Sequence, residues 1–133
     1  NNLIVNYADS PYAALSAMTL AKLEIEDGKL DEGRKHLDWV TNNSKLQAMK
    51  DTAMVRLASL DLSDGEVDQA LSRITSVKHC QRMVSCMELK GDILLSQNKF
   101  EDARAAYLQA ITQAETDKAE LSILQLKLDN IGS

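Results

Sequence analysis

The sequence predicts an all-α protein, a helical repeat array of about three helix pairs followed by a C-terminal capping helix. Its composition favours helix: the 133 residues contain one proline and five glycines, with long runs of Ala, Leu, Lys, Glu, Gln and Met. A loop-rich β-sandwich would need turn residues roughly every 8–12 positions. In addition, one short phrase of sequence occurs three times, with starts 37 and then 33 residues apart.

The repeated phrase occupies residues 28–37, 65–74 and 98–107. Each copy opens with a turn-forming residue and places a large apolar residue two positions later. An acidic residue follows at once, then a very small residue two further on, and a bulky one four positions after that. A small residue lets two helices approach closely, and a period near 34 residues is typical of paired-helix arrays. The first large apolar residues are Leu30, Val67 and Phe100, the small ones Gly33, Ala70 and Ala103, and the bulky ones Leu37, Ile74 and Tyr107.

Three helices are predicted in the first half of the chain. Ser10 is a good N-cap, and Pro11 suits the first helical position because its missing N–H would have no partner there. Ser44 and Gln47 match a capping box. The predicted helices cover about 11–27, 30–42 and 45–63.

Four more helices are predicted in the second half. Asn98 and Glu101 are expected to cap one of them. The last helix contains a local alternation typical of a strand, but Leu121, Leu124 and Leu128 follow helical spacing. The predicted helices cover about 66–76, 82–96, 99–115 and 117–131.

The whole chain, 1–133, is expected to form a single domain. Residues 1–8 resemble the end of a helix that began earlier, and the first residue is Asn1 rather than methionine. We therefore expect a domain of a longer protein or a processed product, and any membrane anchor would lie upstream of it. The predicted repeats cover about 11–43, 45–77 and 82–115, with the capping helix at about 117–131.

Charge and hydropathy restrict the partners. The net charge of −5 and the lack of a basic patch argue against a nucleic-acid partner, whose binding needs clustered Lys and Arg. No run of 18 apolar residues occurs, so no membrane-spanning helix is predicted, and no membrane contact is expected of this domain.

Cys80 and Cys86 are six residues apart. On one continuous helix their side chains would point about 120° apart, which excludes a disulfide. A disulfide becomes possible if Cys80 lies in the preceding loop, so the sequence leaves this pairing open. The spacing of the two cysteines from His36 and His79 fits no zinc pattern, and no metal site is predicted.

No catalytic residues and no cofactor are predicted. The glycines are scattered singly, so no phosphate-binding loop exists, and neither histidine lies in a recognisable motif. Asp61, Asp64 and Glu66 lack the spacing of a calcium-binding loop and are expected to form a solvated helix end. We therefore predict that the protein is not an enzyme.

The small–large pairing resembles the tetratricopeptide repeat. Gly33, Ala70 and Ala103 match the family's small position, with Leu37, Ile74 and Tyr107 at its bulky one. The repeats are degenerate, because the usual tryptophan and closing proline are both replaced. The pairs at the family's Leu–Gly position are Leu20–Ala21, Leu57–Ala58 and Lys90–Gly91, and Ala17, Met54 and Met87 replace the tryptophan.

A second resemblance covers nearly the whole chain. The segments ADSPYAALSAMTLAKLEIEDGKLDEG and MELKGDILLSQNKFEDARAAYLQAI look like the ancillary subunit family of the bacterial Sec (SecYEG) translocon. The resemblance implies a periplasmic tetratricopeptide-like domain, anchored in the inner membrane by an upstream span. It also implies work beside the translocon with a membrane-anchored prolyl isomerase, and chaperone-like handling of unfolded, newly exported polypeptides.

The first helix of each pair is expected to line a concave protein-binding face. The alternative is that the apolar members Leu15, Ile25, Val55 and Leu62 belong to the core. Glu88 and Asp92 are either two solvated acids or contacts for a basic partner. The predicted face comprises Leu15, Met18, Lys22, Ile25, Thr52, Val55, Ser59, Leu62, Glu88, Asp92 and Leu95.

Two other functions remain open at this stage. One is a cytoplasmic scaffold, which the two cysteines do not exclude. The other is a structural homo-oligomer, formed through exposed leucine-rich faces of the last helix.

Overall fold

The computed structural model describes residues 11–114 and 117–131, and within them every regular element is helical, which confirms the all-α fold class. The chain divides into two compact units, Asn1–Leu57 and Ala58–Ser133. The helices are α2 (Pro11–Glu26), α3 (Leu30–Asn43), α4 (Gln47–Ser63), α5 (Val67–Thr75), the 3₁₀ turn η1 (Cys80–Arg82), α6 (Val84–Ser96), α7 (Phe100–Ala114) and α8 (Lys118–Ile131). The predictions for residues 1–8 and for the cap at Ser10 fall outside the described residues.

The turn inside each helix pair has the same backbone structure three times. Gly28, Gly65 and Asn98 adopt the left-handed conformation, with φ of 83°, 80° and 61°. Each helix therefore ends in a Schellman motif, in which two successive N–H groups return to carbonyls of the last turn. The longer returns run from the N–H of Lys29 to Glu24 O (2.7 Å), of Glu66 to Asp61 O (2.8 Å) and of Lys99 to Leu94 O (2.9 Å).

The small and bulky positions of the repeated phrase are buried, as predicted. Gly33 lies against α2, where an added Cβ would be 2.7 Å from Cγ1 of Ile25. Gly91 lies under the ring of Tyr107, which is fully buried. Ala70, Ala103, Leu37 and Ile74 are also buried. By contrast, Leu30 and Phe100, two of the first large apolar residues of the phrase, are 41% and 49% exposed.

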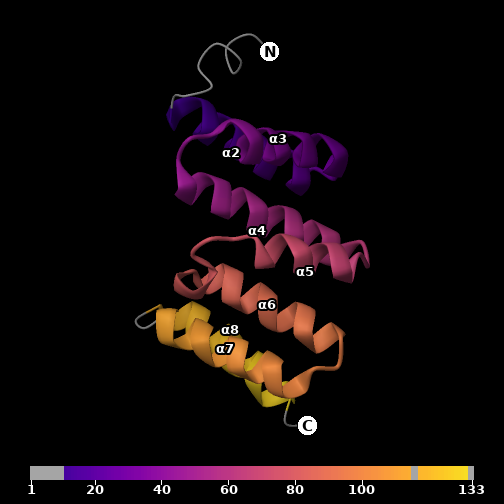
Figure 1. Ribbon diagram of the computed structural model, residues 1–133, viewed down its shortest axis with the longest axis vertical. Helices are drawn as coiled ribbons and strands as arrows, with labels where there is room; N and C mark the ends of the chain where they lie inside the picture. Colours follow the sequence, from indigo (N-terminus) through magenta and orange to yellow (C-terminus); the bar gives the residue numbers. More distant parts are fainter. Residues whose placement is uncertain (1–10, 115–116, 132–133) are drawn as a thin grey trace. The chain divides into compact units, whose positions relative to one another are not determined.

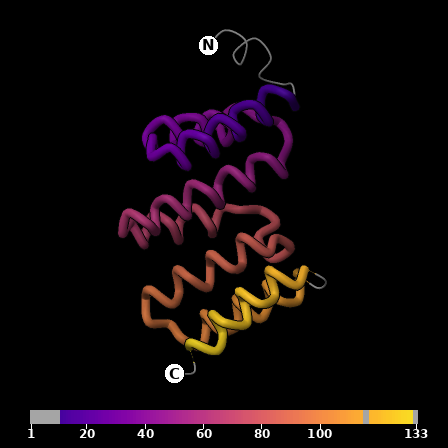
Figure 2. Tube along the Cα trace, turned by 180° about the vertical axis from the view of Figure 1, so that it is seen from behind, coloured from indigo at the N-terminus to yellow at the C-terminus, as the bar shows by residue number. Residues whose placement is uncertain are grey.

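Within the first unit, α2 and α3 lie side by side (Figures 1 and 2). Their contact buries a row of alanines on α2 against Leu37 and Val40 of α3. A hydrogen bond between His36 Nδ1 and Glu24 Oε1, 2.5 Å long, joins the same two helices.

Within the second unit, α7 packs against both α6 and α8 (Figure 2). Leu124 of α8 is fully buried, and Leu121, Leu128 and Ile131 pack on the same core. These four residues therefore lie on one face of a helix, and the strand-like alternation in this segment does not form a strand. The side chain of Asp117 caps α8 by accepting a hydrogen bond from the N–H of Glu120 at 3.1 Å.

Two predicted capping interactions are wrong. The Gln47 amide donates to Asp51 Oδ1 at 2.8 Å instead of returning to Ser44, and Ser44 Oγ accepts from the N–H of Leu46. In the described chain, the Asn98 side chain makes no hydrogen bond to the start of α7. Its backbone ends α6 in the left-handed conformation, so Asn98 takes the place that glycine holds in the other two turns.

The acidic residues at the end of α4 are not all solvated, contrary to expectation. Asp61 is 3% exposed, and Arg73 Nε donates to its Oδ2 at 2.5 Å. This pair joins the end of α4 to α5, and a buried carboxylate needs such a partner.

Cys80 and Cys86 form a disulfide. Cys80 lies in η1, before α6 begins, and this is the arrangement under which the spacing of six residues permits a bond. The Cα atoms are 5.2 Å apart. The disulfide fixes the connection between the second and third helix pairs to the first turn of α6.

Candidate protein-binding surface

The predicted surface residues on α2 divide into exposed and packed side chains. Leu15 is 52% exposed and Lys22 is also exposed. Ile25 is half-buried against Gly33, and Met18 is buried in the core of the first unit. Leu15 and Lys22 are therefore the members that a partner of α2 can reach.

On α4 only Ser59 is exposed among the predicted residues. Val55 is only 7% exposed, so it belongs to the core and not to an accessible binding face. Thr52 and Leu62 are half-buried. Thr52 and Val55 belong to the first unit, whereas Ser59 and Leu62 belong to the second.

On α6 the predicted residues turn inward to α8. Leu95 packs against the apolar core of the second unit, and Glu88 and Asp92 meet Lys127 of α8. The two carboxylates are therefore neither solvated without a partner nor open to a basic group of another protein. Their basic partner is supplied by the same chain.

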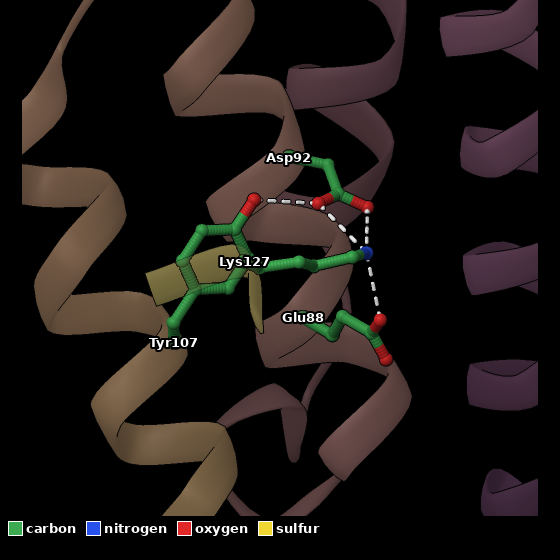
Figure 3. A network of polar contacts seen from close by, with 4 residues as sticks. All are labelled: Glu88, Asp92, Tyr107 and Lys127. Atoms are coloured by element: carbon green, nitrogen blue, oxygen red, sulfur yellow. Dashed lines mark hydrogen bonds and ion pairs between the residues drawn. The ribbon is translucent and has the colours of Figure 1, made fainter. Parts of the chain in front are cut away.

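Figure 3 shows the resulting network of four side chains. Lys127 Nζ lies 2.7 Å from Glu88 Oε2 and 3.0 Å from both carboxylate oxygens of Asp92. The Tyr107 hydroxyl donates to Asp92 Oδ1 at 2.6 Å, and Lys127 Nζ lies 5.9 Å from the centre of the Tyr107 ring. One ammonium thus neutralises part of the charge of two carboxylates and fixes α8 to α6.

The network shifts the pKa values of its proton donors upward. Burial raises the pKa of the Tyr107 phenol, and its hydrogen bond to Asp92 raises it further. Burial acts to lower the pKa of Lys127, but the hydrogen bonds to Glu88 and Asp92 outweigh it, and the net shift is upward. Both groups therefore keep their protons at neutral pH, as the geometry requires.

Sequence reasoning missed Lys127, which lies 35 residues beyond Asp92. The available signal was weak: a lysine in the middle of a leucine-rich stretch of helix. It also missed an apolar stripe on α2. Tyr12 and Leu23 are 79% and 56% exposed and lie on the same helix face as Leu15.

Among residues 11–114 and 117–131, no group of three or more His, Cys, Asp or Glu side chains is arranged to hold a metal ion. No helix in this part of the chain is long and apolar enough to cross a membrane.

Paired helices joined by identical turns, with small residues facing bulky ones, define a helical-repeat protein of the kind that presents surfaces to partners. The chain belongs to the tetratricopeptide repeat-like domain family, whose family model matches residues 1–133.

Curated relatives agree with the resemblance seen in the sequence. The chain is 29% identical over 126 residues to the "Ancillary SecYEG translocon subunit" of Neisseria gonorrhoeae, covering 95% of this chain and 60% of that protein. The protein of the same name from Aggregatibacter actinomycetemcomitans is 28% identical, with 98% and 63% covered, and the one from Escherichia coli is 23% identical, with 90% and 58% covered. The chain thus spans about 60% of the length of these relatives. No solved structure matches the chain.

Proposed function

We propose that this chain is a non-enzymatic protein-interaction domain that assists the Sec translocon. The observation that carries this proposal is the similarity to ancillary SecYEG translocon subunits over at least 90% of the chain. The tetratricopeptide repeat-like fold supports it, since such arrays present extended surfaces to other proteins.

We place the domain on the periplasmic side of the bacterial inner membrane, held there by an anchor outside this sequence. The disulfide between Cys80 and Cys86 supports this location, because structural disulfides persist in oxidising compartments such as the periplasm and are rare in the cytosol. It favours the periplasm over the cytoplasmic scaffold that the sequence left open.

In this role the domain handles unfolded, newly exported polypeptides as a chaperone-like partner, together with a membrane-anchored prolyl isomerase. The stripe of Tyr12, Leu15 and Leu23 on α2 supports polypeptide binding. Exposed apolar side chains grouped on one helix face suit contact with apolar segments of many sequences.

Site-specific photo-crosslinking in cells tests this function in the full-length, membrane-anchored protein. A photoreactive residue at Leu15 is expected to give adducts with translocon subunits, the isomerase or exported chains. The matched control is the exposed Lys35 on α3, which lies outside the stripe and is expected to give none. Equal adducts from both positions, or none from Leu15, would argue against the stripe as the binding surface.

A second candidate function, homo-oligomerisation, is favoured by one observation. Ile123 and Leu126 on α8 are 46% and 63% exposed and lie on one face of the helix. Sedimentation of the purified chain at increasing concentration tests it. A dimer that Leu126→Glu converts to a monomer would support pairing through α8, and a monomer at all concentrations would exclude it.

A further inference from the structure

A basic hollow follows one side of α6 within the second unit. It consists of two adjoining pockets, with cavity volumes of about 390 and 520 Å³, which share Gln81, Met87 and Lys90. One end is bounded by the segment 77–82, and the other by α7. Pockets of this size accommodate several side chains of a bound segment.

The end of the hollow near η1 is strongly positive. The cations Lys78, Arg82 and Lys90 line it beside His79, and none of the three forms an ion pair with another described residue. This cluster stands out in a chain with a net charge of −5. By contrast, Lys127 and Arg73 are each paired with a carboxylate. The opposite end of the hollow carries the carboxylate Asp102.

Between these ends the lining includes apolar side chains beside Gln81 and Gln109. The apolar ones are Met87 and Leu94 of α6 and Ala105 and Ala106 of α7. Positive charge at one end, apolar side chains in the middle and a carboxylate at the other end make the hollow directional.

Two links hold the basic end in place. The disulfide ties Cys80, which lines the hollow, to α6. The Gln109 amide on α7 donates to the backbone carbonyl of Gln81 at 3.3 Å. The cations of the 78–82 segment are therefore presented from a connection fixed at both sides rather than from a loose loop.

We propose that this hollow binds an acidic segment of a partner polypeptide. A carboxylate of that segment lies among Lys78, Arg82 and Lys90, and the apolar side chain that follows it packs on Met87 and Leu94. The cations line a recess, which admits a side chain but not a flat bilayer, and the acidic chain as a whole repels anionic lipid. A polypeptide is therefore the better complement.

The site is separate from the α2 stripe and goes beyond the function proposed above. Lys90 lies two residues from both Glu88 and Asp92, about 200° around the helix, so it faces away from the network with Lys127. The stripe belongs to the first unit and the hollow to the second. Either one can fail without the other.

Fluorescence anisotropy tests the proposal with the whole chain at low salt. The probe is a short fluorescein-labelled peptide in which glutamate and leucine alternate, compared with the same peptide carrying glutamine for glutamate. The double variant Arg82→Gln/Lys90→Gln is expected to weaken binding of the acidic probe about tenfold, the order expected for losing charge-assisted contacts. The control Lys99→Gln/Lys118→Gln removes two exposed lysines outside the hollow and is expected to change affinity less than about twofold.

Equal affinity for the two probes, or an equal loss in both double variants, would overturn the proposal, because the attraction would then be non-specific. Sedimentation with vesicles of anionic phospholipid tests whether the hollow binds a membrane surface, the other source of negative charge. Vesicle binding that depends on Arg82 and Lys90, without peptide binding, would assign the hollow to a membrane surface instead. Crosslinks from Leu15 are expected to persist in Arg82→Gln/Lys90→Gln, so the two proposals fail independently.

Discussion

The ring of Tyr107 on α7 lies directly over the backbone of Gly91 on α6. A Cβ at position 91 would be 2.4 Å from Tyr107 Cε1 and 2.6 Å from its Cδ1. The same ring carries the hydroxyl that donates to Asp92, the neighbour of Gly91. The absence of a side chain at residue 91 thus allows the largest side chain among the bulky repeat positions to reach the polar network.

Gly91→Ala is expected to destabilise the protein by about 1–2 kcal/mol. Overpacking against a buried, rigid ring costs about 1–3 kcal/mol, and the better helix propensity of alanine returns up to about 1 kcal/mol. Urea unfolding followed by circular dichroism measures the difference. Gly33→Ala is the matched comparison and should cost less, because its added Cβ meets Ile25, a smaller and half-buried side chain, instead of a fully buried ring. A cost for Gly33→Ala as large as that for Gly91→Ala would contradict this account.

Lys127→Met is expected to lower the free energy of unfolding by about 1–3 kcal/mol. The substitution keeps the apolar stem but leaves Glu88 and Asp92 close together without their cation, in a half-buried site. Thermal and urea unfolding give the value. Lys118→Met, at the exposed start of α8, is expected to change stability by less than about 0.5 kcal/mol. If both variants behaved alike, the network would hold α8 no more firmly than a surface charge does.

Stability is expected to fall as the pH rises above about 10. The pKa values of Tyr107 and Lys127 are raised above their ordinary values of 10.0 and 10.5. The folded protein therefore binds these protons more tightly than the unfolded chain does. Their contribution is complete below pH 10 and is lost as the pH rises toward the folded values. Urea unfolding at a series of alkaline pH values measures the decline, which should be less steep in Tyr107→Phe. An identical decline in that variant would exclude Tyr107 as a source.

Reduction of the disulfide is expected to cost about 2 kcal/mol and to leave the helical content unchanged. A bond closing a loop this short removes only a modest amount of entropy from the unfolded chain. The core formed by α6, α7 and α8 does not depend on it. Urea unfolding with and without reductant gives the value, and Cys80→Ser/Cys86→Ser should match the reduced protein and ignore the reductant. Loss of the helical signal on reduction would show that the bond is needed for folding itself.

Local pattern was sufficient to predict the helices and the faces that meet within each pair. The small and bulky residues of the repeated phrase are four positions apart, so each pair lies on one helix face, and all six are buried. They are Gly33, Ala70 and Ala103 with Leu37, Ile74 and Tyr107. Helix starts were less predictable. Ser44 and Asn98 have side chains suited to capping, but Ser44 accepts from the N–H of Leu46 and Asn98 adopts the left-handed conformation that ends α6. A capping motif is recognised from three or four residues. Whether its hydrogen bonds form depends on the backbone conformation of the residues that precede the helix.

The predicted binding face shows where sequence reasoning stops. Helical register places Leu15 and Met18 near one another on α2, yet Leu15 is exposed and Met18 is buried. Which of the two side chains is buried depends on where the neighbouring helices pack. The spacing of apolar residues along α2 does not specify where those helices lie. The same holds for Glu88 and Asp92, whose partner Lys127 is brought to them only by the packing of α7 and α8.

The three identical turns also decide where this chain can change length. Each left-handed residue ends one helix, and two residues later the next helix begins, so an added residue would break both hydrogen bonds of the motif. The difference between the 37- and 33-residue spacings of the repeated phrase lies instead in the helices and in the connections between pairs, 44–46 and 76–83. An insertion after Gly28, Gly65 or Asn98 would therefore disrupt a helix pair, whereas one at the exposed Lys45 would leave all three turns unchanged.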